Sequence, residues 1–313
     1  MENPMNFAVI GTGAVGGYYG GLLCRHGFET HFLLHSDYAH VRDNGLVVDS
    51  KDGDFKLEKV NVYGRAQDMP RCDVVIVSLK TTANDQLSAI LPHVVKPGGV
   101  VMALQNGLGV EKVIQDIVPD ATVIGGLCFL CSNKIGPGHI HHLDFGSVRL
   151  GEYREDGSAA GITPVLQRVA EAFQAAGISV DLAENLALAR WQKLVWNMAF
   201  NGVTVVLNAA TDQLMADSSA LELVRGIMEE VVAGARACGH PLDENFIEIM
   251  IAATKNMVAY RPSMMLDFEV CRELEVEEIY RQPIEAARKA GVAMPLSQTV
   301  AWQLEFLDRR NRG

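Results

Sequence analysis

The stretch Asn6-Phe-Ala-Val-Ile-Gly-Thr-Gly-Ala-Val-Gly16 decides the fold of the N-terminal part of this chain. Gly11, Gly13 and Gly16 stand in G-x-G-x-x-G spacing between a short apolar run, expected to be a strand, and a small-residue segment, expected to be a helix. Gly11 permits a tight turn, Gly13 lets the backbone approach a pyrophosphate, and Gly16 lets the helix pack on the strand. The first N–H groups of such a helix face phosphates. The sequence therefore predicts a dinucleotide-binding turn, whereas glycines that only make the turn compact are the alternative.

The pattern around this turn predicts an α/β fold in two domains. From residue 6 to about 182, short apolar runs alternate with amphipathic helical stretches, which is typical of a parallel sheet covered by helices. Residues 1–182 are expected to form a Rossmann domain that binds NAD(P). Residues 183–313 are expected to form a mostly helical domain for substrate and catalysis. The expected strands are residues 7–11, 30–34, 73–79, 99–104, 121–126, 147–151 and 178–182.

Composition and charge exclude several classes of protein. Of the 313 residues, 49% are hydrophobic and 21% are charged, as in soluble globular proteins. The net charge of −11 would repel a phosphate backbone, so nucleic acid is not an expected partner. Met1–Phe7 lacks a basic signal region, and no stretch reaches the roughly 18 apolar residues of a membrane span. We expect a cytoplasmic protein without membrane contact.

The Cys128-x-x-Cys131 pair, with histidines shortly after it, has two interpretations. One is a metal site or redox pair. The other is two structural thiols, because the segment is expected to be a strand, on which positions three apart face opposite ways, and no second C-x-x-C follows. We favour the thiols and expect no metal.

The end of the second expected strand bears on the choice of cofactor. An NAD site usually carries Asp or Glu there to hold the ribose hydroxyls. This chain has His35 and Ser36 instead, which favours NADP, although Asp37 follows directly. His35 as an ordinary surface residue is the alternative.

A polar row on an apolar helix is the strongest sign of a substrate site. Residues 189–202 are apolar in nearly every helical direction, which predicts a buried helix. Lys193, Asn197 and Asn201 nevertheless stand at i, i+4 and i+8 and form one row. Burying an ammonium and two amides against hydrocarbon costs several kcal/mol, so the row should line a polar cavity. A solvated stripe at the edge of the domain is the alternative. The segment 262–278 contains candidate carboxylates, one of which is expected to face Lys193 while most are ordinary solvated charges. Spacing alone does not choose among Asp267, Glu269, Glu273, Glu275, Glu277 and Glu278.

Together these segments resemble the ketopantoate reductases (2-dehydropantoate 2-reductases) over nearly the whole chain. The resemblance rests on five islands in the same order: Gly11–Gly16, Val77–Lys80, Gln105–Gly107, the Lys193/Asn197/Asn201 row and the stretch Ser263–Glu275. It implies a Rossmann domain followed by a helical domain like that of 6-phosphogluconate dehydrogenase. It also implies reduction of the 2-keto group of ketopantoate by NADPH.

The resemblance assigns a role to each matching position. Lys193 becomes the general acid, and Glu275 the carboxylate that binds substrate and supports the lysine. Asn197, Asn201 and Ser263 hold substrate oxygens. Lys80 and Asn106 lie near the nicotinamide, where Asn106 also approaches the substrate. The cofactor positions are Gly11, Gly13, Ala14, Val15, Gly16, His35, Ser36, Lys80 and Asn106.

Departures from the family pattern concern the cofactor and the substrate. His35 stands where the family usually has Arg, and Leu274 where it has Thr. Tyr280 and Arg281 replace the usual Asn-Gly pair. Tyr280 and Arg281 keep open a related dehydrogenase for another 2-keto or 3-hydroxy acid. A cofactor-binding sensor without turnover is a second alternative, against which the set Lys193, Asn197, Asn201 and Glu275 argues. The expected partner is a small 2-keto acid, and a homodimer is left open.

Overall fold

The computed structural model describes residues 5–257 and 259–313. Residues 1–4, part of the segment on which the expectation about a secretory signal rested, lie outside the described part. The chain divides into two compact units, one containing residues up to 105 together with 110–186, and the other residues 106–109 together with 187–313. The boundary suggested after Leu182 remains a prediction. Among the described residues, no helix combines the length and apolar character that crossing a bilayer requires.

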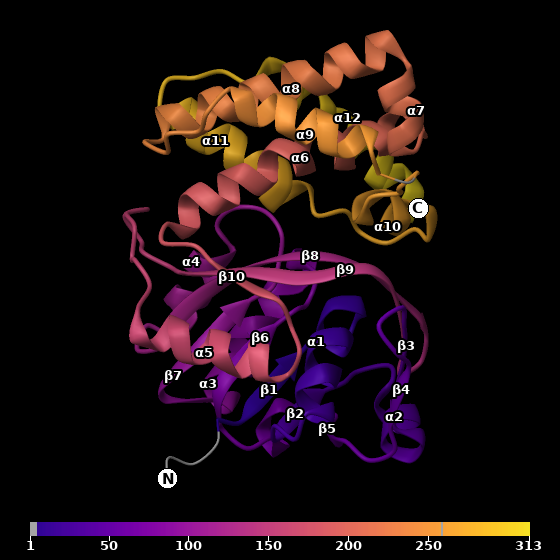
Figure 1. Cartoon of the computed structure of the whole chain (residues 1–313), viewed down its shortest axis with the longest axis vertical. Coiled ribbons are helices and arrows are strands. Elements are labelled where there is room, and N and C mark those ends of the chain that lie inside the picture. The colour runs from indigo at the N-terminus through magenta and orange to yellow at the C-terminus, as the bar shows by residue number, and fades with distance from the viewer. Residues whose placement is uncertain (1–4, 258) are drawn as a thin grey trace. The chain divides into compact units, whose positions relative to one another are not determined.

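The first unit is built on one large sheet (Figure 1). The strand order is β4-β3-β9-β8-β7-β6-β1-β2-β5, and β10 pairs with β9. The strands are β1 (Phe7–Ile10), β2 (Thr30–Leu33), β3 (Leu46–Ser50), β4 (Phe55–Leu57), β5 (Asn61–Tyr63), β6 (Cys72–Val77), β7 (Val95–Ala103), β8 (Thr122–Gly136), β9 (His139–Glu152) and β10 (Val180–Leu182).

The parallel sheet expected from the sequence is confirmed at its centre, where β2, β1, β6, β7 and β8 run parallel. It is wrong for two pairs, since β8 with β9 and β3 with β4 are antiparallel. The cause is local: Pro137 and Gly138, the latter at φ 62°, turn the chain straight back along β8. A parallel return would have needed a long crossover connection. The short strands β3, β4 and β5 were not expected.

Helices cover both faces of this sheet because side chains alternate along each buried strand. Phe7 and Val9 of β1 join a core shared with α1 (Ala14–Arg25) and α5 (Pro164–Ala175). Ala8 and Ile10 face the opposite way, toward α3 (Leu87–Val94) and α4 (Val110–Ile117). The remaining helical segments are α2 (Tyr38–Asn44) and the 3-10 turns η1 (Ala66–Asp68) and η2 (Thr81–Gln86). The glycine turn between β1 and α1 is thus held by a strand buried on both faces.

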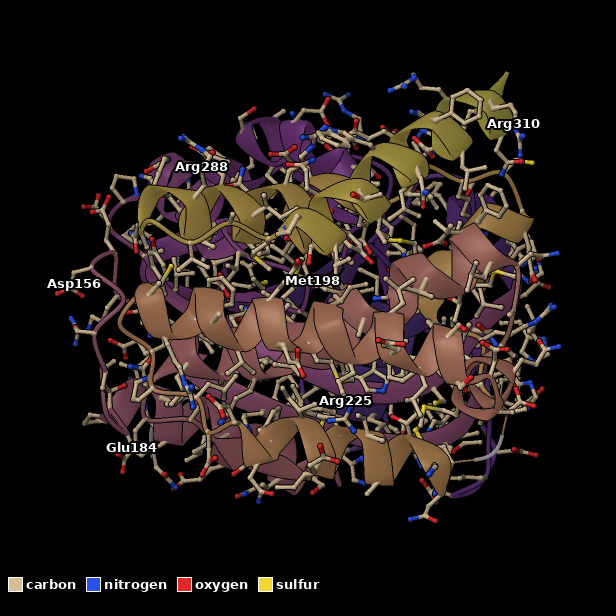
Figure 2. All side chains as sticks on the ribbon, turned by 90° about the horizontal axis from the view of Figure 1, so that it is seen from above. Asp156, Glu184, Met198, Arg225, Arg288 and Arg310 are labelled. Carbon is tan, nitrogen blue, oxygen red and sulfur yellow. The ribbon has the colours of Figure 1, made fainter. Side chains whose placement is uncertain are left out.

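The second unit is helical around one hydrophobic core, and Figure 2 shows Met198 among its helices and Arg288 and Arg310 at its margin. The central α6 begins at Leu186, just before the boundary between the units. α8 starts at a side-chain cap, because the carboxylate of Asp217 accepts a hydrogen bond from the Ala220 amide at 2.8 Å. The elements are α6 (Leu186–Leu207), α7 (Thr211–Ala216), α8 (Ser218–Ala237), α9 (Asn245–Lys255), α10 (Ser263–Glu269), the π-helical turn η3 (Glu277–Arg281), α11 (Gln282–Lys289) and α12 (Pro295–Arg312).

Candidate functional site

Gly11 and Gly16 shape the turn that follows β1. Gly11 has φ 96°, and a Cβ there would lie 2.6 Å from the backbone nitrogen of Leu79. A Cβ at Gly16 would collide with the Ser78 hydroxyl and the Gly11 carbonyl. Ser78 Oγ lies 2.7 Å from that carbonyl oxygen and donates a hydrogen bond to it. The turn is therefore held by Ser78, which directly follows β6 and precedes Leu79 and Lys80 in the sequence.

Gly13 differs from the other two glycines, because a Cβ at this position would meet nothing within 4 Å. Beside it, the buried Thr12 hydroxyl has no hydrogen-bond partner in the described part of the chain. Ala14 and Val15, both only partly buried, begin α1 without a side-chain cap at Gly13. Open space, an unpaired hydroxyl and uncapped amides together fit a phosphate group better than a turn that is merely compact.

Asp37, whose charge would disfavour NADP, forms an ion pair and hydrogen bonds within the protein. Its side chain is 7% exposed and lies 2.6 Å from Lys134 Nζ on β8. It also accepts hydrogen bonds from the Gly138 amide at 2.8 Å and from the Ser36 hydroxyl at 3.1 Å. Burial would raise the pKa of Asp37, but the hydrogen bonds from Lys134 and Gly138 and the lysine charge lower it below its ordinary value. His35 and Ser36, by contrast, are exposed.

Lys80 follows the end of β6 and is half-buried at the start of η2. The segment around it is held by Gln105, whose Nε2 donates to the Leu79 carbonyl at 2.9 Å and to Asn84 Oδ1 at 2.7 Å. The backbone beside Lys80 is thus held next to the glycine turn, since Leu79 also lies against Gly11.

The polar row lies on a helix that is buried as the sequence predicted. Asn197 and Asn201 are 6% and 2% exposed, and Lys193 is half-buried. Lys193 Nζ donates a hydrogen bond to Asn106 Oδ1 at 2.9 Å. Asn106 belongs by its contacts to the helical unit although it follows the strands of the first unit in sequence. The structure therefore joins two of the residues singled out in the sequence, 87 positions apart.

Burial reduces the set of candidate carboxylates in residues 262–278. Asp267 and Glu275 are both 5% exposed, whereas Glu269, Glu273 and Glu277 are exposed. Neither of these two buried carboxylates is without an interaction partner in the protein. Ser263 is half-buried and opens α10.

The two departures at positions 280 and 281 do not present free side chains for a substrate. Tyr280 is fully buried in the helical core, and its hydroxyl donates to the Met198 carbonyl oxygen at 2.5 Å. Arg281 pairs with Glu305 through Nε at 2.5 Å. Each of these two side chains therefore has a structural partner within the helical unit.

Sequence reasoning missed three features of this site. Thr12 was passed over as the variable position between two glycines. Lys134 carries no motif and reaches Asp37 only through the β8–β9 hairpin, whose Gly-Pro-Gly turn was the signal available. The contact between Tyr280 and α6 had no signal beyond the departure itself.

Comparison with known proteins gives a consistent result over both units. Residues 7–155 match the family described as ketopantoate reductase PanE/ApbA, and residues 185–307 match the family described as its C-terminal part. A 2-dehydropantoate 2-reductase of Nostoc sp. (strain PCC 7120) is 52% identical over 310 residues, which cover 99% of this chain and 97% of the relative.

Solved structures share the fold at high coverage. The 2-dehydropantoate 2-reductase of Geobacter metallireducens GS-15 is 38% identical with a TM-score of 0.91, over 96% of this chain and 99% of that one. A ternary structure of D-mandelate dehydrogenase with NADH and anilino(oxo)acetate has a TM-score of 0.87 at 20% identity, over 98% of this chain and 99% of that one. At that identity the likeness concerns the fold alone.

Proposed function

The chain belongs to the ketopantoate reductase family, and from that premise we propose that it reduces 2-dehydropantoate (ketopantoate) to pantoate with NADPH. The observation that carries the proposal is the hydrogen bond from Lys193 to Asn106 on a helix that is otherwise apolar and buried. The amide oxygen of Asn106 accepts a hydrogen bond from the Lys193 ammonium and so fixes the direction of a group that can donate a proton. A sensor without turnover has no need of this arrangement.

Within this proposal, the glycine turn holds the cofactor. The amides that begin α1, at Ala14 and Val15, and the Thr12 hydroxyl bind the pyrophosphate over Gly13, while Gly11 and Gly16 keep the backbone close. When bound, the reduced nicotinamide supplies a hydride to the carbonyl carbon. Lys80 and Asn106 are the residues that we propose to bind that end of the cofactor.

The preference for NADPH over NADH is proposed on charge. The exposed His35 and Ser36 offer hydrogen bonds to a 2′-phosphate, and neither repels it. Asp37 would repel it, but its carboxylate is paired with Lys134. Neutralising a carboxylate next to a phosphate site removes the repulsion that NAD-specific sites use against NADP.

Lys193 completes the reduction as the proton donor. As the C2 carbon of the 2-keto acid accepts a hydride and its two electrons, the oxygen of the breaking C=O π bond takes a proton from Lys193 Nζ, and water later returns that proton. Asn106 Oδ1 orients the ammonium. Glu275 supports the lysine and binds the substrate, and Asn197, Asn201 and Ser263 hold its carboxylate and hydroxyl oxygens. A positioned acid of this kind contributes roughly 100-fold to 10,000-fold.

The assay that tests this function measures the loss of reduced cofactor with a panel of 2-keto acids. Ketopantoate with NADPH should have the highest kcat/KM, above unbranched 2-keto acids and phenylglyoxylate. A better rate with phenylglyoxylate would favour a related dehydrogenase of the same fold, and cofactor binding without turnover of any acid would favour a sensor. We extend the proposal to a homodimer in the cytoplasm, which light scattering and fractionation test.

A further inference from the structure

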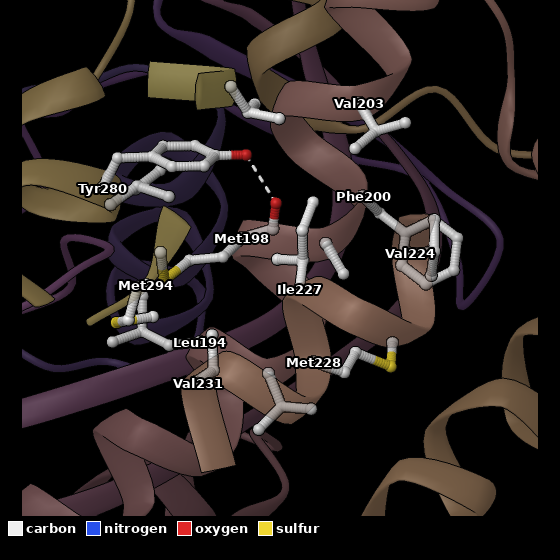
Figure 3. Close-up of a cluster of buried hydrophobic side chains, with 14 of the residues drawn as sticks. Leu194, Met198, Phe200, Val203, Val224, Ile227, Met228, Val231, Tyr280 and Met294 are labelled. Carbon is white, nitrogen blue, oxygen red and sulfur yellow. Dashed lines mark hydrogen bonds between the residues drawn. The ribbon is translucent and has the colours of Figure 1, made fainter. Parts of the chain in front are cut away.

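The buried hydroxyl of Tyr280 lies against the main chain of the helix that carries the polar row. Figure 3 shows it donating to the Met198 carbonyl oxygen, 2.5 Å away. Gly202 also lies against this oxygen, since a Cβ on Gly202 would overlap it. Burial raises the pKa of Tyr280 far above its ordinary value, so the hydroxyl remains a donor at any physiological pH. The hydroxyl therefore lies beside Met198 and Gly202, whose carbonyl and amide are the groups that an α-helix pairs between residues i and i+4.

Gly202 is required for this contact. A Cβ at position 202 would overlap the Tyr280 hydroxyl and would lie 2.7 Å from its Cζ and 2.8 Å from Val300 Cγ1. Glycine in a helix interior destabilises it by about 1 kcal/mol relative to alanine. The glycine in the middle of α6 thus leaves room for the Tyr280 ring. The ring packs against residues 198–202, a stretch that follows Asn197 directly and includes Asn201.

Tyr280 sits in a π-helical turn, η3, that has a cause in the sequence. Pro283 has no N–H, and in a regular α-helix its ring would clash with the carbonyl of Ile279 four residues earlier. The wider turn of a π-helix, Glu277–Arg281, accommodates this conflict directly after Glu275. The π-helical turn thus has a local cause in the sequence, in addition to its contact with α6.

The same turn holds a second part of the site. The Leu108 amide donates to the Glu278 carbonyl oxygen at 2.9 Å, and a Cβ at Gly107 would lie 2.5 Å from the Glu278 carbonyl carbon. Gly107, at φ 92°, directly follows Asn106, the hydrogen-bond partner of Lys193. One short turn therefore contacts the backbone beside Asn106 and the backbone between Asn197 and Asn201.

We propose that η3 is the positioning element of the substrate site, with Tyr280 setting the α6 turn that carries Asn197 and Asn201 and Glu278 setting the loop that carries Asn106. Tyr280 is a positioning residue that acts through the main chain of α6. The inference rests on the proposed function only in taking these amides as ligands of the 2-keto acid. Misplacing such a group by about 1 Å costs on the order of 100-fold in rate, so a shift of a few tenths of an ångström is measurable.

The test removes the hydroxyl alone, in Tyr280→Phe. If the hydroxyl positions the amides, KM for ketopantoate rises about tenfold while kcat changes by less than about threefold, since the amides hold substrate and transition state alike. The Kd for NADPH stays at the parent value. In hydrogen exchange, the amides of residues 197–204 exchange faster than in the parent protein.

The matched control is Tyr19→Phe, which deletes another buried hydroxyl that donates to a backbone carbonyl, that of Ser147 at 3.1 Å in the first unit. It should lower the Tm about as much as Tyr280→Phe and leave KM unchanged. If both variants lose stability alike while KM and α6 exchange stay at parent values in Tyr280→Phe, the tyrosine only fills the core and the inference is wrong.

A second variant, Gly202→Ala, approaches the same contact from the helix. Its added methyl displaces the hydroxyl and should raise KM similarly, and Tyr280→Phe/Gly202→Ala should be less impaired than the sum of the two changes because the overlapping oxygen is gone. Additive effects would contradict the inference. If the parent protein does not reduce ketopantoate, the proposed function fails, and α6 exchange in Tyr280→Phe alone decides the positioning role.

Discussion

Replacing Lys193 by methionine tests the proposed acid directly. The unbranched methionine side chain keeps most of the aliphatic packing and removes the ammonium that donates to Asn106 at 2.9 Å. A hydrogen bond from a charged group stabilises by about 1.5 to 3 kcal/mol, and burying part of an ammonium costs a similar amount. Because Glu275, which is 5% exposed, would also lose the cation that the proposed site gives it, the free energy of unfolding should fall by roughly 3 kcal/mol or less. The variant should still fold and bind NADPH.

The expected effect is on the chemical step. Loss of a positioned acid should lower kcat by about 100-fold to 10,000-fold, equivalent to about 3 to 5 kcal/mol of transition-state stabilisation. Single-turnover measurements with cofactor deuterated at the transferred position should show a larger isotope effect than in the parent protein, because hydride transfer then limits the rate. Near-parent kcat would mean that water or another residue delivers the proton.

The matched control is Lys289→Met, the same substitution on an exposed lysine of α11 in the same unit. Lys289 lies 3.6 Å from Glu285, and its side chain is 71% exposed. Exposed pairs of this kind contribute little to stability. Lys289→Met should have the kinetics of the parent protein, and a fall in kcat in both variants would point to a general effect of lost charge.

Three further predictions concern the first unit. Gly13→Val should keep the parent Tm, because a Cβ there meets nothing within 4 Å, yet lose binding of NADPH and NADH in fluorescence titrations; retained affinity would make the turn merely structural. Lys134→Met should weaken NADPH relative to NADH, because Asp37 then faces the 2′-phosphate unpaired; an unchanged ratio of the two Kd values would remove the charge argument. The folded pKa of Asp37 lies below its ordinary value of 3.8, so its stabilisation is complete above that value and disappears as pH falls through the lower folded pKa. Asp37→Asn should therefore flatten the acid limb of Tm against pH, and an acid limb as steep as that of the parent would contradict this.

Much of the fold could be predicted because its signals are local. The apolar runs of β1 and β6 and the glycine spacing need only neighbouring residues to be interpreted, and the parallel centre of the sheet followed from them. The three-residue strands β4 and β5 carry too few residues for a period of two to appear, so they were missed. The β8–β9 hairpin was missed although Gly136-Pro-Gly138 is a turn signal, because the strand after it was expected to begin only at residue 147.

In the candidate site, too, features that depend on local spacing could be predicted, and contacts between distant residues could not. The row Lys193, Asn197, Asn201 follows from helical spacing alone, and its burial is as expected. The partner of Lys193 does not follow from any spacing, because Asn106 lies 87 residues earlier and joins the helical unit only through the fold. The ion pair between Lys134 and Asp37 likewise follows from no spacing in the sequence. Because of this pair, the charge of Asp37 is balanced by a lysine, whereas the sequence alone suggested a carboxylate that repels a phosphate.

Tyr280 shows how a departure from a family pattern acquires its meaning from what it contacts. A tyrosine where an asparagine is usual suggests a remodelled substrate pocket as long as the side chain is assumed to face the pocket. In the structure the ring is fully buried and its hydroxyl reaches the main chain at Met198, beside a glycine that no other residue could replace without moving the ring. In the proposed site, Tyr280 therefore acts on the position of the Asn197 and Asn201 amides and not on which groups the substrate meets. Substrate identity is accordingly better judged from Lys193, Asn197, Asn201 and Glu275 than from position 280.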